Sequence, residues 1–469
     1  MTDTFFWYDL ETTGTDSQLD RIVQFAGQRT DAALNPIGAP INFYIKPSWD
    51  TLFHPEAALV TGISPRDLDR EGLSELEGLT KIYECFSEPG TCVVGYNSFK
   101  FDDEFIRQGF YRNFFDPYGR EWQHGNSRWD LIQLVRFAYA LRPDGIRWPE
   151  TASGRPSFKL EDLAEANGLL HEQAHDALSD IHATIGLAKQ LQRSQPKLFD
   201  YHYKMRRKHA VLDALYPLGK QAVLLTGGYG PVTDRTLVPV LPLMPHPVNA
   251  NSLLCIDLRV DPSTYLDLSA ERLIDRFMKF EQNTGEYRLL HQVQINRCPP
   301  FAPISTLPEK TQSQLSWQVD DLAGFVKKIQ STPKLHPLLS EAMSAESRPT
   351  SDDVDCQLYS GGFVSAVDQQ QFARARQWVN GGQSVVFTEE RLNELFFRFR
   401  ARHDATGLVP EEHSRWIDFL RRRWINEDRL LVRYQLTLSC QSEDPTNRLL
   451  AELIDRLQRQ AASAAISLD

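Results

Sequence analysis

The sequence predicts a chain of three parts: an α/β domain, then a small β-rich domain, then an all-α domain. Strand-like and helix-like runs alternate in the first part, and short apolar runs broken by Gly and Pro make up the second. Helical spacing of apolar residues returns in the third part. We expect the domains at residues 1–195, 196–348 and 352–469, with a polar linker that carries Ser and Pro at 344–355.

The first domain begins with a strand-like run at 4–11, and a second such run occupies 91–97. Strands that alternate with amphipathic helices predict a sheet that is covered on at least one face. The helical spacing occurs in four segments, at 102–115, 127–141, 159–169 and 176–192.

A composition shift marks the second domain. A basic run at 204–210 comes first, and the apolar runs of 221–260 are then interrupted by Gly and Pro, which is typical of a small barrel or sandwich. The third domain has three segments of helical spacing, at 390–402, 411–424 and 447–460.

The composition is that of an ordinary globular protein. The chain has 469 residues, 41% hydrophobic residues and a net charge of −11. No stretch has the roughly 18 consecutive apolar residues of a membrane span, and the N-terminus lacks the pattern of a secretory signal. The six scattered cysteines form no CxxC pair, so we expect a reducing, cytoplasmic setting. Taken alone, the net negative charge argues against a nucleic-acid partner.

The first strand-like run carries two acidic residues. Asp9 and Glu11 lie two residues apart, so the period of a strand places both carboxylates on one face together with Trp7. Burying two like charges is costly unless a cation holds them, and a solvated strand end is the alternative interpretation. Thr12 follows in the sequence ETTG, which offers hydroxyl groups and a turn at the carboxyl end of the strand, where open α/β sheets place ligands.

Two further groups of acidic residues begin helices. Asp102, Asp103 and Glu104 follow the second strand-like run, and capping of a helix N-terminus is the alternative explanation for them. His175 precedes Asp180 by five residues; we expect His175 in the lead-in to the last helix of this domain and Asp180 one turn or more inside it, and a structural role is the alternative for the histidine.

Carboxylates from one strand and two helices, together with one histidine, suit a two-metal site for phosphoryl transfer. Mg²⁺ prefers oxygen ligands, and two such ions about 3.5–4 Å apart can stabilise both the attacking and the leaving oxygen. A histidine with a pKa near neutrality can deprotonate the attacking water.

At these residues the sequence resembles the DnaQ-like 3′→5′ exonucleases, in the subclass with three Asp, one Glu and a catalytic His. Asp9-x-Glu11, Asp102 and His175-x4-Asp180 match the three motifs of that superfamily in order. The resemblance implies a ribonuclease-H-like α/β fold for the first domain. It extends to the bacterial exonuclease I family, which adds an SH3-like and a helical domain, through three further segments at 126–150, 157–169 and 195–201.

The resemblance also implies the activity. It is that of a 3′→5′ exodeoxyribonuclease that is specific for single-stranded DNA, releases nucleoside 5′-monophosphates and serves DNA repair or recombination. His175 would activate the water, and Asp103 is the alternative to Asp102, which we choose because it follows Asn97 by five residues. Two Mg²⁺ ions, or Mn²⁺, would be held by four carboxylates, those of Asp9, Glu11, Asp102 and Asp180.

An enzyme that runs along single strands needs a cationic groove with aromatic stacking surfaces. Trp122 and other aromatic candidates have core packing as the alternative interpretation, as have Tyr359 and Phe363, which also offer stacking surfaces. Lys159 keeps the charge of the arginine that is usual at its position in the family but lacks the planar fork. The resemblance and the ETTG turn imply strand contacts for eight residues: Thr12, Arg107, Tyr118, Trp122, Arg136, Phe158, Lys159 and Lys208.

Members of the exonuclease I family bind the acidic C-terminal tail of single-stranded-DNA-binding protein. Arg142 and Tyr201 match the family positions for that contact. The resemblance further implies a monomer with no membrane partner.

Two other functions fit parts of the sequence. An RNA-directed 3′→5′ exonuclease of the same superfamily would use the same site, but such enzymes lack two further domains. A catalytically silent DNA-binding scaffold would have lost carboxylates, whereas all four are present here. If DNA is the substrate, the net charge of −11 predicts local binding in a groove and little affinity for duplex elsewhere.

Overall fold

The structure is a computed structural model that describes residues 3–169, 177–226, 235–278, 287–344, 350–425, 447–464 and 466. The chain divides into two compact units. The first comprises Met1–Ser127, Glu172–His182 and Pro349–Asp469, and the second comprises Arg128–His171 and Ala183–Arg348. Each unit is described by itself below.

The first unit is built on a mixed sheet. β1 (Thr4–Thr12) pairs antiparallel with β2 (Ile22–Thr30), and β2 pairs antiparallel with β3 (Pro36–Tyr44). On its other side β1 pairs parallel with β4 (Thr91–Gly95), and the order of the sheet is β3-β2-β1-β4-β5. Because β1 is an inner strand with neighbours on both sides, the residues that it carries are held rigidly.

The sequence pattern does not reveal β2 and β3. β2 is buried almost throughout, and the first five residues of β3 are exposed, so neither strand shows the alternation of a half-buried strand. The expected helix at 127–141 is wrong in its first four residues, because Ser127–Asp130 forms β5. α5 (Leu131–Leu141) then follows, with the Asp130 side chain accepting a hydrogen bond from the Ile132 amide at its start.

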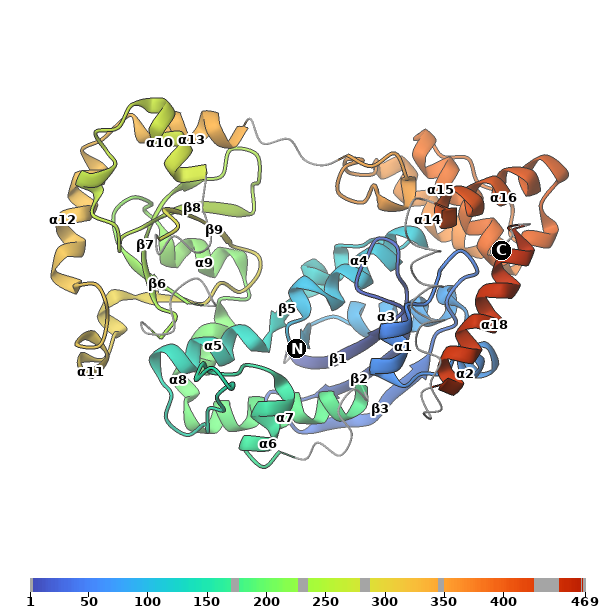
Figure 1. Ribbon diagram of the computed structural model, residues 1–469, viewed down its shortest axis with the longest axis horizontal. Helices are drawn as coiled ribbons and strands as arrows, with labels where there is room; N and C mark the ends of the chain where they lie inside the picture. Colours follow the sequence, from blue (N-terminus) through green and yellow to red (C-terminus); the bar gives the residue numbers. More distant parts are fainter. Residues whose placement is uncertain are drawn as a thin grey trace. The chain divides into compact units, whose positions relative to one another are not determined.

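Helices of the first unit come from both ends of the sequence (Figure 1). From the N-terminal part, α3 (Glu75–Ser87) and α4 (Asp102–Arg112) contribute Phe86 and Phe110 to a core that also contains Phe6 of β1. The same core includes residues of α14 (Ala366–Gln377) and α15 (Glu390–His403). The C-terminal helices therefore share a core with the N-terminal sheet.

Phe114 shows how closely these two segments pack. It has a positive φ of 58° after the end of α4, and its ring contacts aromatic rings more than 250 residues later in the sequence. The ring centroids lie 5.2 Å from Phe387, 5.8 Å from Phe396 and 5.6 Å from Phe399.

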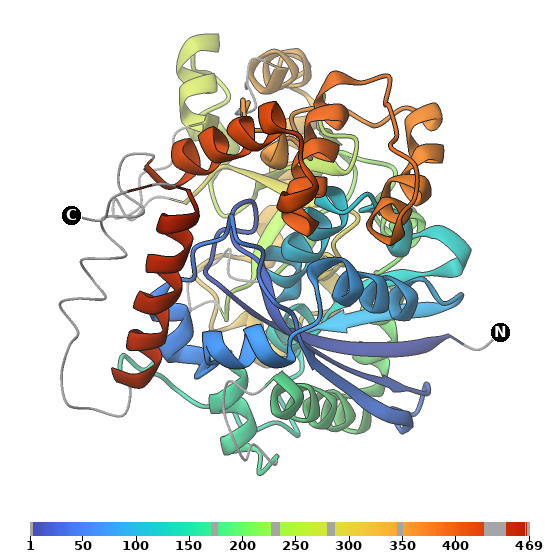
Figure 2. The same cartoon turned by 90° about the vertical axis from the view of Figure 1, so that its right-hand side faces the viewer.

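The last described helix lies against the first two. α18 (Asn447–Ser463) runs beside α1 (Pro55–Thr61) and α2 (Pro65–Glu71), as the red and blue helices in Figure 2 show. α16 (Pro410–Ile425) precedes it in the sequence. Arg456 of α18 binds Asp69 at 2.7 Å and the Pro47 carbonyl at 2.9 Å.

The second unit contains an all-antiparallel sheet in the order β10-β6-β7-β8-β9. The expected barrel or sandwich character of 221–260 is in agreement with these strands, but helices are more numerous than the composition indicates. The strands are β6 (Val223–Leu225), β7 (Val238–Pro245), β8 (Ser252–Asp257), β9 (Leu290–Gln294) and β10 (Phe301–Pro303). The described helices that lie wholly in this unit are α5, α6 (Leu160–Ala166), α8 (Pro196–Lys204), α9 (Lys208–Leu215), α10 (Ala270–Met278), α11 (Glu309–Gln312), α12 (Val319–Gln330) and α13 (Leu335–Ser344).

A buried histidine joins two segments of this unit. The Trp129 indole donates to His202 Nδ1 at 2.9 Å, so the other ring nitrogen carries the proton and donates to the Cys298 carbonyl at 3.2 Å. Burial lowers the pKa of His202 to about 3, and the imidazole is therefore neutral at physiological pH.

The prediction of a linker at 344–355 is wrong for its last two residues. Val354, Asp355 and Cys356 form a buried 3₁₀ turn of the first unit. The three domain boundaries remain a prediction, since the two compact units do not follow the sequence in order. No helix among the described residues is both long and apolar enough to cross a membrane.

Candidate active site

Asp9 is the centre of the acidic site. It lies near the end of β1, opposite Ala26 of β2. Burial raises the pKa of Asp9 well above its ordinary value, and the negative charges of Asp102, Asp180 and Glu11 raise it further. The charges of these three carboxylates therefore act on Asp9.

The three acidic residues that act on Asp9 lie in the first unit, on three different elements. Glu11 follows Asp9 on β1, just before a register shift in the pairing with β2. Asp102 begins α4, directly after Phe101 at the N-cap position, and lies in an acidic first turn together with Asp103 and Glu104. Asp180 lies in the first described turn of α7 (Ala177–Ser194). His175 lies outside the described residues.

Asp103 has a different environment from its neighbour Asp102. Its Oδ1 accepts hydrogen bonds from the Tyr8 hydroxyl at 3.0 Å and from Arg120 Nη2 at 2.6 Å. Both Asp103 and Arg120 are almost fully buried, with side chains 2% and 0% exposed. Asp103 thus belongs to a buried ion pair, whereas the charge of Asp102 acts on Asp9 and raises its pKa, and this difference agrees with the choice of Asp102 as the candidate ligand.

The chemistry of the carboxylates fits divalent cations. No three Asp, Glu, His or Cys side chains within the described ranges converge as a ready-made metal cluster. The raised pKa of Asp9 nevertheless shows that negative charge accumulates at one place, and a hard cation with oxygen ligands would neutralise it. Asp9, Glu11, Asp102 and Asp180 are the residues that could hold it.

The turn after β1 is tightly built. The Thr12 hydroxyl donates to the Gly14 carbonyl at 2.7 Å, so this side chain is engaged within its own turn. A side chain at Gly14 would lie 2.4 Å from Asp20 Oδ2 and 2.5 Å from His54, which explains the need for glycine.

The predicted strand contacts of the first unit differ in exposure. Arg107 is buried, and its guanidinium binds Glu121 at 2.8 Å and Glu104 at 3.0 Å. It also lies 5.5 Å over the ring of Tyr118, so the structure presents Arg107 as a support for Tyr118 more than as an open phosphate contact. Trp122 is 67% exposed, which excludes core packing as the explanation for this residue.

Tyr359 extends this group from the C-terminal part of the chain. Its hydroxyl donates to Glu104 and accepts a hydrogen bond from Arg107 Nη1 at 3.1 Å. Phe363 is 93% exposed, so core packing is excluded for Phe363 as well. The sequence contains no signal that Tyr359 meets Glu104, because the two residues are 255 positions apart.

The second unit holds the other predicted strand contacts. Arg136 lies 5.9 Å over the ring of Phe158, and Phe158 packs edge-on against Tyr139 at 5.4 Å. Lys159 is exposed at the start of α6. Lys208 is exposed at the start of α9 and donates to Asn251 Oδ1 at 2.7 Å. The role of each in binding a strand stays a prediction.

The two residues expected to bind a partner tail also lie in this unit. Arg142 is half-buried and donates to the Thr306 carbonyl at 3.0 Å. Tyr201 packs against the core of the β-rich sheet, and burial raises its pKa to about 12. Tyr201 is thus a neutral hydroxyl, and the structure leaves the predicted contact with an acidic tail open.

Comparison with known proteins gives the same family over three regions. Residues 6–188 match a family described as exonuclease, residues 206–344 match the exonuclease I SH3-like domain, and residues 352–459 match the exonuclease I C-terminal domain. The chain is 39% identical over 429 residues to exodeoxyribonuclease I of Escherichia coli (strain K12), an alignment that covers 89% of each chain.

Two solved structures are similar over nearly the whole chain. One is a moderately thermophilic exonuclease I from Methylocaldum szegediense, with a TM-score of 0.90, 38% identity and coverage of 98% of this chain and 99% of that one. The other is a zinc-bound form of an E. coli exonuclease I complex with single-stranded DNA, with a TM-score of 0.88, 35% identity and coverage of 99% and 100%.

Proposed function

This chain belongs to the exonuclease I family, and we propose that it is a metal-dependent exodeoxyribonuclease that degrades single-stranded DNA from its 3′ end. The observation that carries the proposal is that Asp9 is buried near the negative charges of Asp102, Asp180 and Glu11, which raise its pKa. A similar exonuclease I has been solved with both single-stranded DNA and zinc, which supports a divalent cation as cofactor. We propose Mg²⁺, with Mn²⁺ as a substitute.

The residues of this chain divide the reaction among them. Divalent cations, when bound, supply Lewis-acid stabilisation of the attacking and leaving oxygens. Asp9, Glu11, Asp102 and Asp180 would hold them, and the rigidity of β1 would fix the first two of these carboxylates. His175 would accept the proton of the attacking water. The product of this hydrolysis is a nucleoside 5′-monophosphate.

For strand binding we propose aromatic and cationic groups. Exposed Trp122 offers a surface on which a base can stack. Arg136, Phe158 and Lys159 combine cationic and aromatic groups in the same way, and Lys208 adds a charge at the start of α9. For Arg142 and Tyr201 we propose contact with the acidic tail of single-stranded-DNA-binding protein.

One experiment tests substrate, direction and metal together. The protein is incubated with single-stranded DNA, duplex DNA or RNA of the same sequence, labelled at either the 3′ or the 5′ end, with Mg²⁺, Mn²⁺ or EDTA. We expect mononucleotides from the 3′ end of single-stranded DNA only, and only with metal. Preferential digestion of RNA would establish the RNA-directed alternative, and metal-independent binding without cleavage would establish the scaffold.

A further inference from the structure

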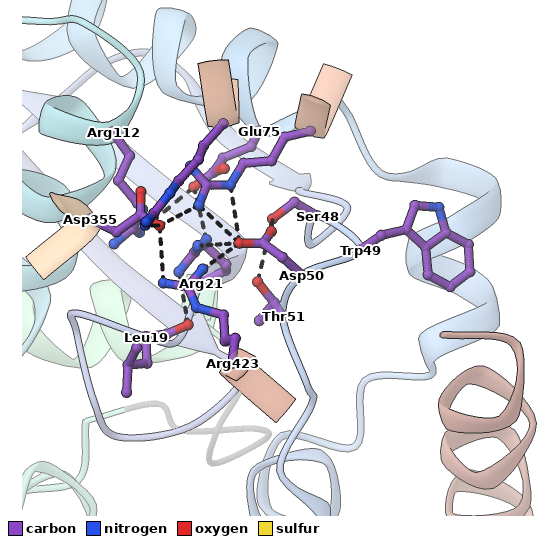
Figure 3. A network of polar contacts seen from close by, with 12 residues as sticks. Leu19, Arg21, Ser48, Trp49, Asp50, Thr51, Glu75, Arg112, Asp355 and Arg423 are labelled. Carbon is purple, nitrogen blue, oxygen red and sulfur yellow. Dashed lines mark hydrogen bonds and ion pairs between the residues drawn. The ribbon is translucent and has the colours of Figure 1, made fainter. Parts of the chain in front are cut away.

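A second group of charges lies buried in the first unit, and no step of the proposed reaction uses it. Asp50 and Asp355 have side chains with 0% exposure. Arg402 Nη2 binds Asp50 at 2.9 Å and Asp355 at 2.5 Å, and Arg21 Nη2 reaches Asp50 at 3.4 Å. Arg423 binds both carboxylates as well (Figure 3). We call these five residues the Asp50 cluster.

The members of the Asp50 cluster come from distant parts of the sequence. Asp50 lies in the segment between β3 and α1, and Arg21 immediately precedes β2. Arg402 lies on α15 and Arg423 on α16. Although burial alone would raise the pKa of Asp50, the three guanidinium groups outweigh it and hold this pKa well below its usual range. Asp50 therefore carries a negative charge.

Arg21 connects the cluster to the turn that follows β1. Its amide donates to Thr13 Oγ1 at 3.0 Å, and the Thr13 amide donates to the Arg21 carbonyl at 2.9 Å. The Arg21 guanidinium also donates to the Leu19 carbonyl at 2.8 Å. Both ends of the 13–20 segment are thus fixed by the residue that binds Asp50.

A second arginine holds the same segment. Arg112 Nη1 donates to the carbonyls of Ser17 at 3.3 Å and Gln18 at 3.2 Å. Glu75 lies between the two arginines, 3.6 Å from Arg21 and 3.7 Å from Arg112. The 13–20 segment is thus bound through its backbone by two buried cations.

The 13–20 segment begins two residues after Glu11. The pairing of β1 with β2 is regular up to Glu11, which lies opposite Gln24, and shifts before Thr12, which lies opposite Ile22, so the turn joins β1 directly beyond its last regularly paired residue. On the other side, the His54 amide donates to the Thr13 carbonyl at 2.8 Å. Because Asp50 and His54 belong to one segment, movement of Asp50 reaches Thr13 by two routes.

We propose that Asp50 is a positioning residue for the proposed reaction: through Arg21 it fixes the 13–20 segment and with it the placement of Glu11 at the end of β1. Since this inference rests on the proposed function, Glu11 is taken as a ligand of the cation. Arg402 and Arg423 anchor Asp50 from the C-terminal helices, and these helices thereby determine the geometry of a metal ligand in the N-terminal sheet. A cluster that only holds the helices in place would affect stability without this effect.

The test separates positioning from stability with two full-length variants. Asp50→Asn keeps the shape of the side chain and removes its charge. Asp257→Asn makes the same change in a buried ion pair of the second unit, where Asp257 binds Arg259 at 2.6 Å and His291 at 3.0 Å. All proteins are measured at one temperature, 15 °C below the lowest Tm of the set. The readouts are Mn²⁺ binding followed by the electron paramagnetic resonance of free Mn²⁺, the single-turnover rate on a 3′-labelled oligodeoxynucleotide, and the Kd for that strand.

We expect Asp50→Asn to weaken Mn²⁺ binding and to slow single turnover by about tenfold each, with the strand Kd within twofold of the wild type. Asp257→Asn is expected to lower Tm and to leave all three readouts within twofold. Asp50→Glu, which restores the charge, is expected to recover most of the Mn²⁺ affinity. Wild-type values for Asp50→Asn in Mn²⁺ binding and turnover would overturn the inference, as would equal losses in the Asp257→Asn control.

A milder variant covers the case in which Asp50→Asn does not fold. Ser48→Ala removes a hydroxyl that donates to Asp50 Oδ1 at 2.6 Å and leaves all the charges in place. A reproducible loss of Mn²⁺ affinity of about twofold to threefold supports the inference, and an unchanged affinity contradicts it. The proposed function fails separately, if the wild type does not cleave single-stranded DNA with any metal.

Discussion

Asp102 and Asp103 are adjacent, yet the structure predicts that replacement by Asn lowers the stability of the protein at Asp103 and its turnover at Asp102. Asp103→Asn retains an oxygen that can accept the Tyr8 hydroxyl but removes the charge that neutralises Arg120, whose side chain has 0% exposure. Breaking a buried ion pair by removing one partner costs about 3–5 kcal/mol. Asp102→Asn instead removes one of the charges that repel Asp9, so its stability should be equal to or above that of the wild type.

These energies translate into a measurable shift. At about 2–4 °C per kcal/mol for a domain of 150–250 residues, Asp103→Asn lowers Tm by roughly 6–20 °C. The assay is thermal unfolding followed by circular dichroism, together with turnover on single-stranded DNA at a temperature at which both variants are folded. We expect Asp102→Asn to lose turnover by at least about 100-fold and Asp103→Asn to retain most of it.

A double variant provides the control. Asp103→Asn combined with Arg120→Met removes both charges and leaves an apolar side chain near the ring of Phe86, over which Arg120 lies at 5.0 Å. Because neutral replacement of a whole buried pair is often tolerated, this variant should recover part of the lost stability. A Tm for Asp103→Asn within 2 °C of the wild type would refute the reasoning. So would loss of turnover in Asp103→Asn with normal turnover in Asp102→Asn.

Three further predictions concern pH, metal and strand binding. The imidazole of His202 has a pKa of about 3 in the folded protein, against an ordinary value of 6.5. Between these two pH values the unfolded chain binds more protons than the folded one, so the stability of the protein falls as the pH is lowered. From pH 7.5 to 5.5 we expect this group to lower the free energy of unfolding by about 1.4 kcal/mol, measured by urea titration, and we expect no such loss in a His202→Gln variant. Mn²⁺ or Mg²⁺ should raise the Tm of the wild type but not that of Asp9→Asn, because the cation relieves repulsion that this substitution already reduces; an equal rise in both would remove Asp9 from the metal site. Trp122→Ala should raise the KM for single-stranded DNA by about 5- to 100-fold at unchanged Tm, since the side chain is 67% exposed, and an unchanged KM would exclude Trp122 from the strand path.

The sequence predicts the chemistry of the site better than its supports. The strand period predicts that Asp9 and Glu11 share one face, and the acidic residues in the first part of two helices point to Asp102 and Asp180 as further candidates. No such period reveals that Asp103 forms an ion pair with Arg120, because only the tertiary structure brings these two residues together. The same is true of Asp50 and Arg402, which are 352 residues apart.

The prediction of exposure is weaker still. Arg107 and Trp122 are both expected from the sequence to contact a strand, but one is buried between two carboxylates and the other is exposed. Helical spacing identifies which face of α4 carries Arg107, whereas the acidic residue that covers this face comes from a 3₁₀ turn at Gly119–Glu121. Such short turns have no sequence period, so their contacts depend on the tertiary structure.

The position of Phe114 has a consequence for synthesis of the chain. Its ring partners Phe387, Phe396 and Phe399 are translated more than 270 residues later, and at about 5–20 residues per second this interval is roughly 15–60 s. During that time the apolar surface around Phe114 has no C-terminal helices to cover it, although the residues of the N-terminal sheet are already available. We therefore expect nascent chains that stop before α15 to bind chaperones and aggregate, and the enzyme to become fold-competent only when nearly all of its length has left the ribosome.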